Sequence, residues 1–317
     1  MGVEVNPLSE TDLDTADSIF RIAFGTFLEL PDPKTAFGDS ELFRTRYRAR
    51  NTRVLAAHLD GTLVGSNVIT RWGSVGWLGP LTILPAHWDR GIARALMDET
   101  EKIFDGWGVT HRGLFTFPQS PKHLALYAKY GYWPRYLTPI FARDLPALDG
   151  PTRRPTSARL YSETPATDRP AVLEAIRELG GTLYPGLDLT GDVESLDRQR
   201  TGETVLLYDD SRLDGVATCH IGAGSEAGGG TTLMKFGAVS PGERRLERLR
   251  ALLEDIETLA RRRGAPRVEV GVKLSHRESY RALLARGYRA DFVGVVMQSP
   301  DEAAYHRPEL DILDDWR

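Results

Sequence analysis

The segment 83–97 places small residues and arginines where a phosphate group could bind. An apolar stretch ends at Pro85, a bend containing Gly91 and Ala93 follows, and an amphipathic helix pattern then begins. The first turn of a helix has free backbone N–H groups and a positive dipole end. Small residues in the bend let an anion approach those groups. Arg90 and Arg94 flank the bend and could neutralise phosphate charge. The pattern predicts a cradle for a phosphate or a pyrophosphate.

A tyrosine and a histidine lie in a second helix pattern, at 120–132, which reads Ser-Pro-Lys-His-Leu-Ala-Leu-Tyr-Ala-Lys-Tyr-Gly-Tyr. Leu124, Tyr127 and Gly131 share one face of this helix. Gly131 is placed to end the helix in the left-handed conformation. A lone tyrosine on a helix is by default a core residue, so any chemical role of Tyr127 depends on the residues around it.

Together the two segments resemble motifs A and B of the GCN5-related N-acetyltransferase (GNAT) family. The matching residues are Gly91 and Ala93 in motif A, and Leu126, Tyr127, Gly131 and Tyr132 in motif B. The motifs occur in the family's order, with a strand pattern at 111–118 between them. The resemblance covers residues 1–148.

Two positions depart from the family pattern. Trp88 stands where the family has Gln or Arg, although its backbone N–H could still donate to a ligand. Ser120 stands where an Asn that touches coenzyme A is common. Contacts at the motif A bend are mostly made by the main chain, so the cradle does not depend on either side chain.

The resemblance implies that the first half binds acetyl-CoA, with no metal, and transfers its acetyl group. It implies that Tyr127 is the general acid toward the coenzyme A sulfur, since a phenol of pKa about 10 can donate to a developing thiolate. The backbone N–H of Ile83 is implied as the oxyanion donor, which can be worth ~3 kcal/mol of barrier. The implied cofactor-binding residues are Leu81, Thr82, Ile83, Trp88, Asp89, Arg90, Gly91, Ile92, Ala93, Arg94, Ser120 and Tyr127.

The general base and the acceptor-binding residues stay open. Many family members have a Glu on the strand before motif A, but segment 77–84 has no ionisable residue. His123, one turn before Tyr127, could deprotonate an amine, and a capping or packing role fits it equally well. Glu29 and Asp32 could bind a cationic substrate, although such residues more often simply face solvent.

The chain contains an internal repeat with an offset of 156 residues. Pro85 falls on Pro241, the strand pattern at 111–118 falls on 267–274, and Gly131-Tyr132 falls on Gly287-Tyr288. A period of this length indicates two domains rather than a solenoid.

The second copy lacks the residues that carry the chemistry. Glu247 replaces Gly91, Leu249 replaces Ala93, and a leucine replaces Tyr127. A carboxylate would face the phosphates, and a leucine would block close approach. We therefore expect a degenerate copy that completes the structure or shapes the substrate site.

These patterns predict an α/β (α+β) protein with two tandem GNAT-like domains, each a mixed, mostly antiparallel twisted sheet flanked by helices. The predicted domains are residues 1–148 and 157–317, joined by a linker at 149–156 that is rich in turn formers. The hairpin signal at Asp60-Gly61 argues against a doubly wound parallel sheet.

Three further segments have specific expectations. The strand at 136–142 should close the sheet of the first copy. The glycine-rich segment 222–230 is interpreted as a solvated hairpin tip rather than a phosphate cradle, because no helix begins there. The C-terminal residues 308–317 could fold back onto the body or fray.

Composition fits a globular protein of ordinary type. The chain has 317 residues, 41% hydrophobic and 26% charged, with a net charge of −4. It shows no basic block for nucleic acid, no apolar span for a membrane and no cluster of metal ligands. A single cysteine and the lack of a signal-peptide pattern favour the cytoplasm, in a bacterial setting, as a monomer or homodimer.

The leading hypothesis is an acyltransferase that moves an acetyl group from acetyl-CoA to the amine of a small molecule, by direct attack in a ternary complex. The alternative is a non-catalytic acyl-CoA-binding sensor or scaffold. Trp88 and the missing strand carboxylate favour the sensor, whereas Gly91, Ala93 and Tyr127 favour the enzyme.

Overall fold

The computed structural model describes residues 2–147 and 158–316, so the predicted linker at 149–156 lies outside the described residues. The strands of the first half are β1 (Val3–Pro7), β2 (Thr52–Leu59), β3 (Thr62–Trp72), β4 (Val75–Ile83), β5 (His111–Thr116) and β6 (Trp133–Asp144). Those of the second half are β7 (Ala158–Leu160), β8 (Gly202–Asp209), β9 (Arg212–Gly222), β10 (Gly228–Val239), β11 (Arg267–Gly271), β12 (Arg289–Ser299) and β13 (Ile312–Asp314). The α-helices are α1 (Leu13–Phe27), α2 (Leu42–Tyr47), α3 (Ile92–Trp107), α4 (Pro121–Ala128), α5 (Arg169–Leu183), α6 (Thr190–Gln199), α7 (Arg245–Arg262) and α8 (Arg277–Ala285).

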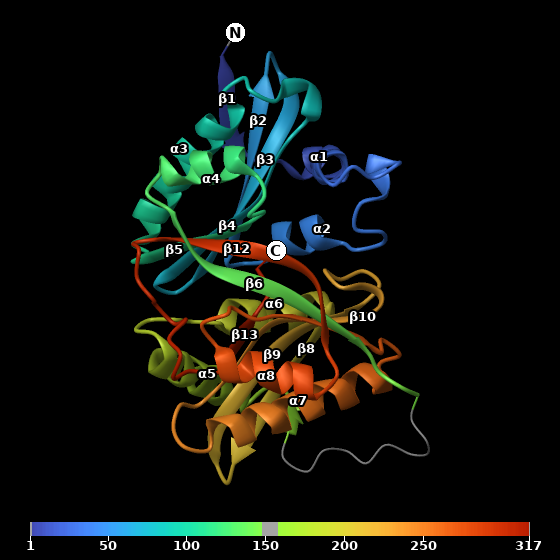
Figure 1. Cartoon of the computed structure of the whole chain (residues 1–317), viewed down its shortest axis with the longest axis vertical. Coiled ribbons are helices and arrows are strands. Elements are labelled where there is room, and N and C mark those ends of the chain that lie inside the picture. Colours follow the sequence, from blue (N-terminus) through green and yellow to red (C-terminus); the bar gives the residue numbers. More distant parts are fainter. Residues whose placement is uncertain (1, 148–157, 317) are drawn as a thin grey trace.

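The strands form one continuous sheet in the order β1-β2-β3-β4-β5-β12-β6-β11-β10-β9-β8-β7, with β13 paired to β10. Figure 1 shows the two halves stacked along the long axis, with β6 and β12 crossing between them. Most neighbouring strands are antiparallel, and helices flank the sheet in both halves. The predicted fold class is confirmed. Of the helices in the described ranges, none combines the length and hydropathy that a bilayer span requires.

Local sequence signals explain the elements around motif A. Asp60 and Gly61 have φ values of 50° and 80°, as a two-residue hairpin turn between β2 and β3 requires. Helix α3 lies between Gly91 and Gly108, both left-handed, and it buries Leu96 among the residues of its apolar face. The strand, bend and helix of motif A therefore form as their pattern predicts.

One offset relates the two parallel strand pairs. β4 pairs with β5 over Val75–Leu78, starting opposite His111. β10 pairs with β11 over Thr231–Met234, starting opposite Arg267. Every residue of the second ladder lies 156 positions after its counterpart in the first, which is the offset of the sequence repeat.

The last strands of the two halves are exchanged. β12 pairs with β5, where Val295 lies opposite Thr116, and β6 pairs with β11, where Phe141 lies opposite Val270. β6 and β12 also pair with each other. The prediction that the strand at 136–142 closes the sheet of the first copy is therefore wrong. The alternation along a strand is the same whichever partner it takes, so the pattern could not reveal the exchange.

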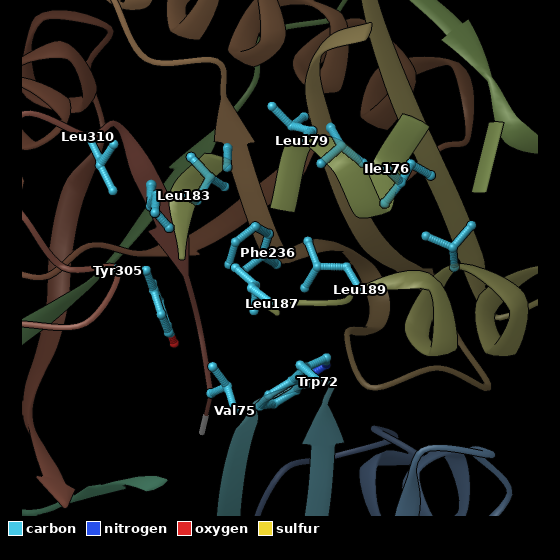
Figure 2. Packing of buried hydrophobic residues seen from close by; sticks show 14 of the residues in the cluster. Trp72, Val75, Ile176, Leu179, Leu183, Leu187, Leu189, Phe236, Tyr305 and Leu310 are labelled. Carbon is cyan, nitrogen blue, oxygen red and sulfur yellow. The ribbon is translucent and has the colours of Figure 1, made fainter. Parts of the chain in front are cut away.

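A hydrophobic cluster fills the space between the halves (Figure 2). Trp72 and Val75 of the first half point toward Leu187, Leu189 and Phe236 of the second. None of these five side chains is more than 3% exposed. Burying side chains of this size stabilises the fold by ~1.5–3 kcal/mol each, so each half supports the other.

The glycine-rich segment 222–230 packs against the first half of the chain, so its interpretation as a solvated hairpin tip is wrong. Ser225 and Glu226 are 0% and 8% exposed. The Ser225 carbonyl accepts from the Glu41 N–H at 2.8 Å. The Ser40 hydroxyl donates to the Glu226 carbonyl at 2.8 Å. The loop is thus fixed against the residues that begin α2.

The C-terminal segment folds back, which is one of the two alternatives that the sequence left open. β13 pairs with β10 over Phe236–Ala238. The ring centre of Trp316 lies 3.9 Å from that of Trp72, and Trp316 is 3% exposed. The end of the chain therefore joins the core between the halves.

Three histidines are buried without charge. His111, His276 and His306 are each 0% exposed. Burial lowers the pKa of His111 to about 4, and burial also lowers the pKa values of His276 and His306. The unfolded chain binds protons to such residues more readily than the folded chain does.

We predict that the free energy of unfolding falls as the pH is lowered from about 6.5 toward 4. The stability contributed by these histidines is fully present above their unfolded pKa, about 6.5, and is lost as the pH falls through their folded pKa values. Urea unfolding at about pH 7 and about pH 5 measures the change. The His111→Gln variant cannot titrate there and should show a smaller pH dependence than the wild type. If the unfolding free energy of the wild type and that of His111→Gln depend equally on pH, His111 does not contribute to the effect.

Candidate functional site

The first half opens between two parallel strands. β4 and β5 pair only as far as Leu78 and then separate. On its other edge β4 has a bulge at the same point, because Gly79 and Pro80 lie opposite the single residue Val68 of β3. A bulge bends the strand that contains it, so this one marks the point where β4 leaves β5.

Beyond the bulge, alternate residues of β4 turn their backbone groups toward the opening. The Leu84 N–H bonds to the Val64 carbonyl of β3 at 2.8 Å, and Thr82 has the equivalent place in the ladder. In an antiparallel ladder the residues between these, Leu81 and Ile83, point their N–H and C=O groups away from the partner strand. This edge can bind an extended arm of a ligand as it would bind another strand.

Helix α3 begins beside this edge with free backbone amides. Gly91 is the N-cap at φ 79°, and the first intrahelical bond joins the Ala95 N–H to the Gly91 carbonyl at 3.1 Å. The N–H groups of Ile92, Ala93 and Arg94 precede that bond and are available to an anion. A Cβ atom added at position 91 would meet no protein atom within 4 Å, so the space beside the N-cap is open.

Cationic side chains surround the start of α3. Arg90 and Arg94 are exposed and have no ion-pair partner in residues 2–147 or 158–316. Lys122 of α4 pairs with Asp89 at 2.6 Å and lies 5.7 Å from the ring centre of Trp88. Lys122 and Asp89 are 57% and 77% exposed, so solvent screens their pair and a phosphate could take the place of the carboxylate.

Trp88 uses its indole N–H within the chain. Nε1 donates to the Ile83 carbonyl at 2.8 Å, and the side chain is 37% exposed. The indole N–H thus satisfies a carbonyl on the free edge of β4, and the backbone N–H of Trp88, the donor expected for a ligand, bonds to the Pro85 carbonyl at 3.2 Å. A ligand arm that pairs with Ile83 has to displace the indole.

Tyr127 has a buried ring and an unpartnered hydroxyl. The side chain is 8% exposed and shares a hydrophobic cluster with Ile92 and Leu96, against which Leu81 and Ile83 pack. No described residue forms a hydrogen bond with the hydroxyl. Burial raises the pKa of the phenol above its usual value, so the phenol keeps a proton to donate.

Three of the residues predicted to bind the cofactor have side chains that bond or pack within the protein. Ser120 caps α4 by accepting from the His123 N–H at 3.4 Å. The Thr82 hydroxyl lies 3.0 Å from that of Ser66 inside the protein. The Ile92 side chain is 1% exposed, so only its backbone can reach a ligand.

The predicted acceptor-side residues are only partly brought together. His123 packs against Phe27 at the end of α1, with ring centres 5.1 Å apart, and Glu29 follows two residues later. Burial, together with the charge of Lys122, lowers the pKa of His123, so its neutral ring can accept a proton. Asp32 instead caps the short 3-10 helix Pro33–Thr35. The carboxylates of Glu29 and Asp32 are both exposed.

The equivalent opening in the second half is filled by the chain itself. β10 and β11 pair only as far as Met234, and β13 then pairs with β10 over Phe236–Ala238. With the offset of 156, these residues correspond to 80–82 of β4. The second half therefore presents no free edge for a ligand arm at this place.

The carboxylate of Asp311, just before β13, lies at the start of α7. Asp311 pairs with Arg245 and accepts from the Ser279 hydroxyl of α8 at 2.7 Å. Glu247 lies on the surface in an ion pair of its own. Leu249 is packed in the core. The prediction that it blocks the start of the helix is therefore wrong. The C-terminal segment fills this cleft.

A buried ion pair between the halves was missed from the sequence. Arg46 donates to Glu226 at 2.9 and 3.2 Å and to the Gly79 carbonyl at 3.1 Å. Lys235 also donates to Glu226, at 2.8 Å. Burial raises the pKa of Glu226, but the charges of Arg46 and Lys235 outweigh burial and hold that pKa well below its usual range. The one available signal was that Arg46 shares a helix face with buried Leu42.

A cavity of about 40 Å³ adjoins this ion pair. A single water needs ~10–15 Å³ on this measure, so the cavity has room for only a few waters.

The sequence pattern of the acetyltransferase (GNAT) family matches residues 18–132. That range contains the β4 edge, the start of α3 and Tyr127. Residues 18–132 of the chain therefore carry the pattern of the GNAT family. Acyl transfer from acetyl-CoA is the chemistry of this fold. Comparison with curated proteins found no match.

Three solved structures resemble nearly the whole chain. A candidate acetyltransferase of Pyrococcus horikoshii has 15% identity and a TM-score of 0.66, over 98% of this chain and 93% of its own. A GCN5-related N-acetyltransferase of Sphaerobacter thermophilus has 17% identity and a TM-score of 0.57, over 94% and 95%. A tandem GNAT protein from the clavulanic acid biosynthesis pathway has 16% identity and a TM-score of 0.56, over 94% and 98%. At these identities the likeness concerns the fold, and it fits a tandem GNAT arrangement.

We predict that Gly91→Glu abolishes coenzyme A binding. The carboxylate would stand in front of the free amides of α3, and a side chain in the left-handed conformation adds ~1–2 kcal/mol of strain. Calorimetric titration with coenzyme A measures the effect. Gly106→Glu is the matched control, because it adds the same charge at an exposed site near the other end of α3. Unchanged affinity in Gly91→Glu would refute the cradle.

Proposed function

We propose that this GNAT protein transfers the acetyl group of acetyl-CoA to the amine of a small molecule, by direct attack in a ternary complex, and that the opening between β4 and β5 is its catalytic site. The observation that supports this most is the free backbone edge of Leu81 and Ile83 beside the free amides of α3. The second half has lost the corresponding edge to β13.

The chain supplies binding and charge stabilisation for this reaction. Acetyl-CoA brings the thioester that is attacked. The amides at the start of α3, with Arg90 and Arg94, hold the pyrophosphate, and the edge of β4 aligns the extended arm. The Ile83 N–H stabilises negative charge on the thioester oxygen, an effect worth ~3 kcal/mol of barrier for a preorganised donor. Tyr127 donates its proton to the departing sulfur.

His123 is our proposed base. Its lowered pKa leaves the ring neutral, and it can take the proton of the amine directly or through a water. Glu29 and Asp32, exposed beyond the end of α1, would attract a cationic acceptor toward that side of the opening.

The second candidate is a non-catalytic acyl-CoA sensor. Two observations favour it: Trp88 covers the Ile83 carbonyl, and β4 contains no ionisable residue. Both functions require the cleft to bind acetyl-CoA, and they differ in whether bound acetyl-CoA reacts.

Incubation of the protein with acetyl-CoA and a panel of small amines separates the two candidates. We predict release of the free thiol with at least one amine, above the rate without protein. Tight binding of acetyl-CoA with no thiol release on any amine would favour the sensor instead.

We predict that Tyr127→Phe lowers kcat by roughly 10²-fold, the scale of a lost general acid, and leaves the affinity for coenzyme A nearly unchanged. Tyr130→Phe is the matched control, because its hydroxyl bonds to Asp98 at 2.6 Å on the surface. Steady-state kinetics and calorimetry provide the two readouts. Full activity in Tyr127→Phe would exclude Tyr127 from proton transfer.

A further inference from the structure

The bulge of β4 leaves a backbone carbonyl that needs a partner. Gly79 and Pro80 together face Val68, so the Gly79 carbonyl lies outside the regular ladder. Backbone carbonyls inside a protein are almost always hydrogen-bonded. Nη1 of Arg46 donates to this carbonyl at 3.1 Å, and thereby fixes the strand where it leaves β5.

Arg46 is itself held by the second half. Its Nη2 and Nε donate to the two carboxylate oxygens of Glu226 at 2.9 and 3.2 Å. Arg46 and Glu226 are 6% and 8% exposed. A guanidinium is planar, with donors in fixed directions. Its grip on the carboxylate therefore determines where its third nitrogen points.

Glu226 has a fixed position of its own. Its backbone carbonyl accepts from the Ser40 hydroxyl at 2.8 Å, and its carboxylate accepts from Lys235 of β10 at 2.8 Å. A continuous path of hydrogen bonds thus runs from β10 of the second half, through Glu226 and Arg46, to Gly79 of the first.

We propose that Glu226 and Arg46 are positioning residues for acyl transfer: they set the β4 bulge and with it the direction of the Leu81 and Ile83 N–H groups. The inference rests on the proposed function, because those N–H groups form the edge that binds the thioester. A displacement of reacting groups by ~1 Å can cost ~10²-fold in rate. The second half thus serves catalysis without binding a cofactor.

Arg46→Lys tests the inference. Lysine keeps the charge beside Glu226, but its single nitrogen cannot hold the carboxylate fork and the Gly79 carbonyl together. Arg44→Lys is the matched control on the same helix, since Arg44 pairs with Glu41 at 3.0 Å nearer the surface. Calorimetry gives the affinity for coenzyme A. The infrared carbonyl stretch of bound acetyl-CoA, labelled with carbon-13 at the thioester, reports the hydrogen bond to the thioester oxygen without any acceptor.

We expect the wild type and Arg44→Lys to lower the carbonyl frequency relative to free acetyl-CoA. Arg46→Lys should lose most of that shift, and kcat on a responsive amine should fall by about 10-fold or more. The affinity for coenzyme A and the KM for acetyl-CoA should stay within about twofold. An unaltered carbonyl frequency in Arg46→Lys, or loss of coenzyme A binding along with it, would overturn the inference.

Glu226→Asp provides a second test if Arg46→Lys does not fold. It keeps the buried charge but withdraws the carboxylate by one methylene, so it should reduce the carbonyl shift in the same direction. An unaltered shift there would also overturn the inference. Failure of the proposed function has a different signature: wild-type protein that does not bind acetyl-CoA, or that binds it and releases no thiol with any amine.

Discussion

The structure depends on how backbone groups are satisfied where two parallel strands separate. An open strand edge exposes donors and acceptors that need partners. In the first half, β4 leaves β5 after Leu78 and keeps a free edge, with one carbonyl covered by Trp88. In the second half, β10 leaves β11 at the equivalent residue, and β13 pairs with the edge. One fold thus leaves an open strand edge in one half and pairs the equivalent edge in the other.

The second half also controls the shape of the first. Through the exchange, β5 of the first half pairs with β12 of the second, and β11 of the second half pairs with β6 of the first. Trp316, at the end of the segment that fills the second cleft, packs against Trp72 of the first half. Arg46 then links Glu226 to the β4 bulge. Under the proposed function, the half without an open cleft holds the strand that binds the thioester in place.

The sequence predicted those features that depend on neighbouring residues, and it missed those that depend on distant partners. The Asp60-Gly61 turn, the left-handed Gly131 after α4 and the family resemblance all follow from local pattern. The strand exchange could not be predicted, because alternation sets the face of a strand and not its partner. β13 has only three residues, too few for a periodic signal. Arg46 and Glu226 lie 180 positions apart, and a charged residue on a helix or in a glycine-rich loop is usually exposed. The domain boundaries and the roles of the site residues stay predictions.

A crystal structure with acetyl-CoA bound tests the central claim most directly. The account predicts one cofactor in each chain, with its diphosphate at the amides of residues 92–94, its extended arm along Leu81 and Ile83, and the Trp88 indole displaced from the Ile83 carbonyl. It also predicts that β13 stays paired with β10. Ligand density between β10 and β11 with β13 displaced, or no density beside β4, would contradict it.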